Sequence, residues 1–75
     1  MLRKYEMKLR KLEEEIKDNL FDMEMIIELI FDYEEMGKST SILERMFNNL
    51  QESTHKLKEE YYQLLDEHRE HNILN

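Results

Sequence analysis

The segment Gly37-Lys38-Ser39-Thr40 carries the last residues of the phosphate-binding loop pattern, in which backbone amides and a lysine hold nucleotide phosphates. The complete pattern needs a glycine five residues before Gly37, where this chain has Asp32. It also needs a preceding strand, whereas the residues before Gly37 are spaced as in a helix. We therefore interpret this segment as a turn and expect no nucleotide and no other cofactor.

Two groups of residues have spacings found in metal sites. Glu52 and His55 stand three apart, as in the glutamate–histidine pairs of di-iron helical bundles, but they fall outside the apolar stripe of their helix. His68 and His71 also stand three apart and lie on that stripe. The alternative for this second pair is a polar end that stops the stripe beside Tyr5, and on this interpretation we expect no metal.

Catalysis requires preorganised groups in a concave site. The chain has no cysteine nucleophile, and two bare helices offer no rigid pocket for a serine, histidine and aspartate grouping. We therefore expect a protein that is not an enzyme.

The elements that would position any site are two long helices. Apolar residues recur at alternating steps of three and four in each half of the chain, which is typical of coiled-coil helices. The only glycine, Gly37, separates the halves. We predict an all-α, antiparallel two-helix hairpin in one domain, 1–75, with helix 1 at about 2–36, a turn at 37–41 and helix 2 at about 42–72. The stripe residues are Leu2, Tyr5, Leu9, Leu12, Ile16, Asn19, Met23, Ile26, Ile30 and Tyr33, then Leu43, Phe47, Leu50, Thr54, Leu57, Tyr61, Leu64, His68 and His71.

The turn sequence predicts both helix ends. Gly37 stands where a left-handed C-terminal cap is wanted, and Ser41 with Glu44 matches a capping box. Folding the chain at residue 39 places Tyr5 near His71, and Met23 near Thr54.

Helix 1 near the turn is apolar over more than the stripe that one partner helix covers. Leu20, Ile27, Leu29 and Met36 flank the stripe on both sides. A second copy of the chain would cover them, so we predict a homodimeric four-helix bundle with these residues at its interface.

Asn19 lies within the apolar stripe, where an amide lowers stability but selects register and oligomeric state. We predict a specificity layer made by Asn19 with Thr54 or with Asn19 of a second chain. The alternative is a locally hydrated gap at a helix bend.

Charge is segregated along the chain, whose net charge is −7. Residues 1–12 are basic, through Arg3, Lys4, Lys8, Arg10 and Lys11. Residues 13–36 carry the acids Glu13, Glu14, Glu15, Asp18, Asp22, Glu24, Glu28, Asp32, Glu34 and Glu35 against Lys17. We expect the basic start to lie beside the acids of the antiparallel helix, which are Glu59, Glu60, Asp66, Glu67 and Glu70.

A second protein is expected to dock on helix 1 through Phe21 and Met25 with the carboxylates Asp22, Glu24 and Glu28. Methionine suits such a surface because its flexible thioether adapts to varied partners. The partner would have a basic or helical docking surface, and the chain would act as an adaptor, co-chaperone or inhibitor.

Two other functions remain open. The acidic half of helix 1 is compatible with an inhibitor that mimics nucleic acid, of the kind that phages or plasmids encode. A basic stripe along Arg3, Arg10 and Lys17 is compatible with a hairpin that binds phosphates, although the net negative charge argues against nucleic acid as a partner.

Hydropathy and composition indicate the cellular location and the type of genome. No apolar run approaches the roughly 20 residues that span a bilayer, and no signal peptide is recognisable, so we expect a cytoplasmic protein that does not enter the membrane. Alanine and valine are absent while isoleucine, asparagine, lysine and glutamate abound, which is typical of an AT-rich genome.

Overall fold

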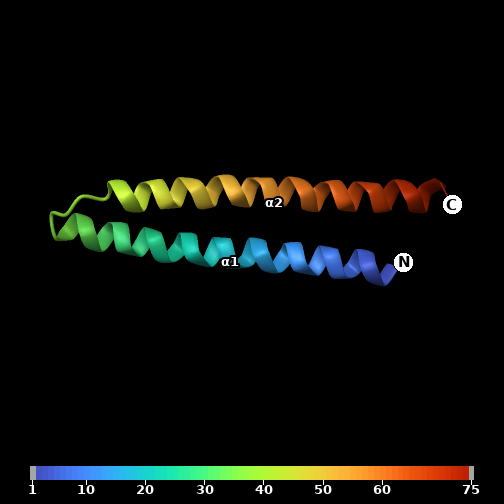
Figure 1. The fold of residues 1–75 in the computed structure, drawn as a ribbon, viewed down its shortest axis with the longest axis horizontal. Coiled ribbons are helices and arrows are strands. Elements are labelled where there is room, and N and C mark those ends of the chain that lie inside the picture. The colour runs from blue at the N-terminus through green and yellow to red at the C-terminus, as the bar shows by residue number, and fades with distance from the viewer. Residues whose placement is uncertain (1, 75) are drawn as a thin grey trace.

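The chain forms two long antiparallel helices that lie side by side, with both termini at the same end (Figure 1). The computed structural model describes the backbone of residues 2–74 and the side chains of residues 3–69. Helix α1 spans Leu2–Glu35 and helix α2 spans Ser41–Leu74, each of 34 residues. The hairpin measures 60 × 16 × 13 Å. Within the described chain, neither helix combines the length and the apolar character needed to cross a membrane.

The predicted apolar stripes meet in one seam between the helices. Every stripe residue with a described side chain is buried or half-buried, while the residues around it are mostly exposed. Three side chains are the most enclosed, with exposed fractions of 8% at Leu12, 6% at Ile26 and 5% at Thr54. The periodicity therefore predicted the hairpin correctly. Leu2 and His71 lie outside the described side chains.

The C-terminal cap of α1 forms as predicted at Gly37, whose φ of 70° lies in the left-handed region. The Lys38 amide donates to the Tyr33 carbonyl at 2.8 Å and the Gly37 amide to the Glu34 carbonyl at 3.1 Å, which together make a Schellman motif. The Lys38 ammonium also lies 5.6 Å from the centre of the Tyr33 ring. The turn is thus held by backbone bonds and a cation–π contact.

The start of α2 differs from the predicted capping box. Helix α2 begins at Ser41, so Thr40 takes the capping position and accepts the Glu44 amide at its carbonyl, at 2.9 Å. The Ser41 hydroxyl instead faces Ser39, with the two oxygens 2.7 Å apart. The helix starts one residue earlier because Thr40 and Ser39 provide the polar groups that Ser41 was expected to supply. At the other boundaries, α1 ends at Glu35 and α2 continues to Leu74, beyond the predicted residue 72.

Hydrogen bonds from tyrosine hydroxyl groups join the two helices in the half of the hairpin away from the turn. Tyr5 donates to the Leu64 carbonyl at 2.6 Å, and Tyr61 donates to Glu13 Oε1 at 2.8 Å. The Tyr5 ring also stacks on His68, with ring centres 4.3 Å apart. The expected neighbour of Tyr5, His71, lies outside the described side chains.

Candidate functional site: two grooves beside the helix seam

The described residues with catalytic or metal-binding spacing do not assemble into a site, and His71, the partner of His68 in the second pair, lies outside them. Gly37 and Lys38 belong to the helix cap described above. His55 contacts Glu59, not Glu52, with 3.0 Å between Nε2 and Oε1 of two exposed side chains. Among the described residues no group of three or more histidine, cysteine, aspartate or glutamate side chains could hold a metal ion.

A first groove lies in the half of the hairpin nearest the turn, and we term it the methionine groove. It has a volume of about 450 Å³. Its lining residues are Asp22, Met25, Ile26, Met46, Asn49 and Leu50. Met25 and Met46 are exposed, with 51% of the Met25 side chain accessible, whereas Ile26 is buried in the seam. The two methionines, one from each helix, therefore form open walls beside a seam residue.

A second groove has a volume of about 490 Å³, and we term it the phenylalanine groove. Its lining residues are Lys17, Leu20, Phe21, Met23, Glu24, Ile27 and Phe47. It shares no lining residue with the methionine groove. Residues that stand two positions apart in an α-helix are separated by about 200° around its axis. Leu20 and Asp22 therefore lie on opposite sides of α1, and the grooves open on opposite sides of the seam.

The residues predicted for dimerisation and those predicted for partner binding do not line separate grooves. Phe21 and Glu24 line the same groove as Leu20 and Ile27, whereas Met25 lines the opposite groove. Asp22 lines the same groove as Met25. Glu28, Leu29 and Met36 are exposed but do not line either groove.

The sequence placed the docking surface on helix 1 and did not show that residues of α2 complete it. Met46 and Asn49 complete the methionine groove, and Phe47 completes the other. Met46 and Asn49 stand three apart and hence on one side of a helix, so their spacing was readable. Their place opposite Met25 depends on how the two helices are staggered, which the spacing alone does not define.

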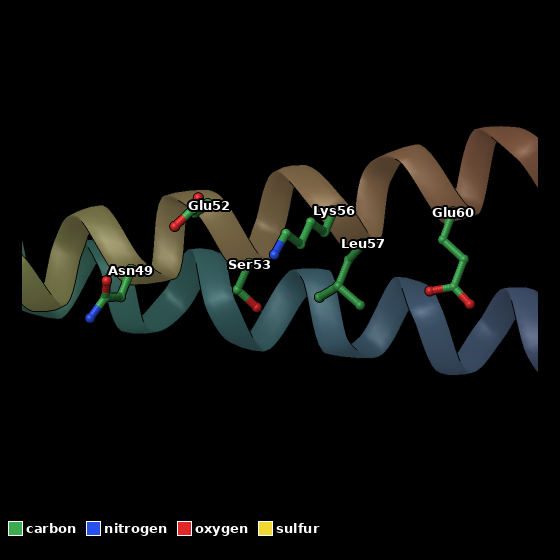
Figure 2. Close-up of a pocket in the computed structure, with 6 residues that line it drawn as sticks. All are labelled: Asn49, Glu52, Ser53, Lys56, Leu57 and Glu60. Atoms are coloured by element: carbon green, nitrogen blue, oxygen red, sulfur yellow. The ribbon is translucent and has the colours of Figure 1, made fainter.

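The methionine groove continues into polar grooves along the same face. Asn49 also lines a groove of about 290 Å³, whose six lining residues all come from α2 (Figure 2). These residues are Asn49, Glu52, Ser53, Lys56, Leu57 and Glu60. Glu60 in turn lines a groove of about 220 Å³ with Lys8 and Lys11 of α1. One face of the hairpin therefore changes from apolar near the turn to mixed charge near the open end.

The acids of α2 lie beside the basic start of α1, as the antiparallel pairing predicts. Loss of hydration raises the pKa of the Tyr5 hydroxyl, and the negative charges of Glu67 and Asp66 raise it further. Among the described side chains, however, no lysine or arginine forms an ion pair with a carboxylate. Glu70 lies outside these residues. Among the described side chains, the carboxylates of α1 are thus not neutralised by direct contact with a lysine or arginine.

Within one chain Asn19 pairs with Ser53 and not with Thr54, while its predicted pairing with Asn19 of a second chain stays a prediction. Asn19 Nδ2 donates to Ser53 Oγ at 3.3 Å, whereas Thr54 donates to the Leu50 carbonyl at 2.7 Å. The Thr54 hydroxyl also contacts Met23 Sδ at 3.9 Å, so the predicted proximity of Met23 and Thr54 is confirmed. Thr54 satisfies its hydroxyl within its own helix, which leaves the half-buried Asn19 amide to Ser53.

The arrangement defines a class of molecule: an antiparallel helical hairpin that presents apolar grooves on two faces. Comparison with models of known protein families, with curated proteins and with solved structures found no match.

Proposed function

We propose that this chain is a non-enzymatic protein–protein interaction module that acts by packing its helices against other helices. The observation that carries the proposal is the exposure of large apolar side chains on both sides of the seam. Leu20, Ile27, Leu29 and Met36 are all exposed, and 61% of the Phe21 side chain is accessible. Contiguous exposed apolar surface is typical of interaction sites.

In this proposal the phenylalanine groove is the homodimer interface. Its lining contains one cation, Lys17, and one carboxylate, Glu24, besides apolar side chains. A symmetric interface sets the same surface against itself, so a charge-balanced groove avoids the repulsion that like charges would cause. Two hairpins packed through this groove make a four-helix bundle, with Leu20 and Ile27 at its centre.

Sedimentation of the purified chain at micromolar concentration tests the dimer. We expect a dimer that persists when the salt concentration is raised, because apolar packing is little affected by screening. Leu20→Ser with Ile27→Ser should shift the chain toward monomer. Met7→Ser with Tyr62→Ser is the matched control, since it removes two exposed side chains outside both grooves. A folded, monomeric wild type would refute the four-helix bundle.

A second candidate function is inhibition by mimicry of nucleic acid. It is favoured by the carboxylates of α1, which form no ion pair with a lysine or arginine among the described side chains. A mimic should lose its target steeply as salt rises, because its contacts are electrostatic. Binding that survives raised salt supports helix packing instead.

A further inference from the structure

We infer that the methionine groove binds an amphipathic helix that carries lysine or arginine next to its apolar stripe. This inference deepens the proposed function and rests on it, because it assigns a partner to the face that the proposed dimer leaves open.

The walls and floor of the groove suit a helix. Ile26 and Leu50 belong to the seam, and the exposed Met25 and Met46 stand beside them on α1 and α2. An amphipathic helix binds such a groove through apolar anchors spaced at three and four residues. Methionine side chains adjust to anchors of different shape.

The charge of the groove favours a positively charged partner. Its lining has one carboxylate, Asp22, the amide of Asn49 and no cation. Asp18 precedes Asp22 by one helical turn on α1 and is exposed. The exposed Arg45 precedes Asn49 by one turn on α2, so the two carboxylates lie on the α1 side of the groove. Neither carboxylate is paired with a lysine or arginine of the described chain, so a lysine or arginine of the partner can form ion pairs with both. An acidic helix would be repelled.

A second copy of the chain does not supply such a helix. Its one strongly basic segment is residues 3–11 of α1. Two of the three apolar residues of that segment are engaged within the hairpin, since Tyr5 bonds to the Leu64 carbonyl and Leu9 is half-buried in the seam. The third, Met7, is exposed but is a single side chain and makes no apolar stripe. The occupant is therefore a different protein with a basic amphipathic helix.

The test uses a synthetic 18-residue peptide of leucine and lysine, with leucines at helical spacing and one tryptophan on the apolar side. The chain has no tryptophan, so the fluorescence reports on the peptide alone. We expect saturable binding with a shift of emission to shorter wavelength. A peptide of the same composition with scattered leucines should bind at least about tenfold more weakly, because it offers no continuous stripe.

Variants locate the site. Met25→Ser with Met46→Ser should weaken peptide binding at least about tenfold, since two apolar contacts are lost. Asp22→Asn should weaken it less and reduce its salt dependence. The matched control, Met7→Ser with Tyr62→Ser, should bind like the wild type. Circular dichroism of each variant establishes that the helices are retained.

Several results would overturn the inference. Equal binding by the methionine variant and the control, or equal binding of the two peptides, would mean that the peptide associates through charge alone. Conversion of a dimeric wild type into a monomer by Met25→Ser with Met46→Ser would mean that a second copy occupies this groove. A monomeric chain that binds the peptide would refute the proposed dimer and leave this inference standing, whereas a dimer that binds no peptide would do the reverse.

Discussion

The two halves of the hairpin bury the same kind of seam with different side chains. In the open half, long aromatic residues bridge the helices, and the hydroxyls of Tyr5 and Tyr61 bond across to Leu64 and Glu13. In the half near the turn, the seam holds Tyr33 and Phe47 among aliphatic and methionine residues, and apolar side chains spread onto both flanks. The open half differs by the tyrosine hydrogen bonds that join its two helices. The other half leaves apolar surface that a further helix can cover.

The largest expected effect comes from the two buried aliphatic residues, one in each half. Leu12→Ala and Ile26→Ala should each lower the free energy of unfolding by about 2–3 kcal/mol, because each leaves a space in a thin seam. Neither residue lines the phenylalanine groove, so if the proposed dimer forms there, the stability of every variant should rise with protein concentration while these two losses stay constant. Chemical denaturation at several concentrations measures both. A loss that changes with concentration in either variant would place that residue at the dimer interface and contradict the proposed groove.

A smaller effect is expected at the turn. Gly37→Ala should cost about 1 kcal/mol in unfolding free energy, because an L-residue is strained at a positive φ. No atom lies within 4 Å of the position that the new Cβ would occupy, so the cost is conformational and not steric. Gly37→Asn is the control, since asparagine tolerates this conformation better. Thermal denaturation of the three proteins checks the ranking, and an unchanged melting temperature in Gly37→Ala would contradict it.

At the junction of the two halves, Asn19→Leu should raise the unfolding free energy by about 0.5–1 kcal/mol while loosening register or oligomeric state. The reason is that the amide makes one long hydrogen bond, to Ser53, and an apolar residue would pack better in the seam. Ser53→Ala removes the same bond but keeps Asn19. Sedimentation and thermal denaturation measure the two consequences, and a clear loss of stability with an unchanged oligomer would assign Asn19 a purely structural role.

The smallest effect should appear at alkaline pH and only in the open half. The hydrogen bond to Glu13 raises the pKa of Tyr61, with smaller contributions from lost hydration and neighbouring charge, and lost hydration raises the pKa of Tyr5. The folded state therefore holds these protons more tightly than the unfolded state. Their contribution is complete below the unfolded pKa, near 10, and is lost as the pH rises through the folded values. Denaturation between pH 8 and pH 11 should show the decline, and Tyr5→Phe with Tyr61→Phe should flatten it.

The periodic seam and the glycine cap were predictable because each depends on local spacing. A step of three or four residues places side chains such as Leu12 and Ile16 on one side of a helix. Gly37 can adopt the left-handed conformation that ends a helix, so it predicts the C-terminal cap of α1. These two signals predict the hairpin without knowledge of any contact between distant residues.

The grooves and the polar layer were not predictable in detail because they depend on how the helices are staggered. Asn19 faces Ser53 and not Thr54 because Thr54 bonds to the carbonyl of its own helix. Phe21 and Met25 stand one helical turn apart on α1 and line different grooves, and their joint role in binding a partner stays a prediction. A small angular difference therefore decides which surface each residue joins.

The single capped turn at Gly37 also has a kinetic consequence. Contacts across the seam span ever longer stretches of chain away from the turn, from 31 residues between Met23 and Thr54 to 59 between Tyr5 and Leu64. Once the turn and its nearest pairs have formed, each further pair closes only a small additional loop, so the entropy of closure is spread over many short steps. The helices should zip from the turn outward and open in the reverse order. In hydrogen exchange, the amides around Tyr5 should therefore exchange before those around Ile26.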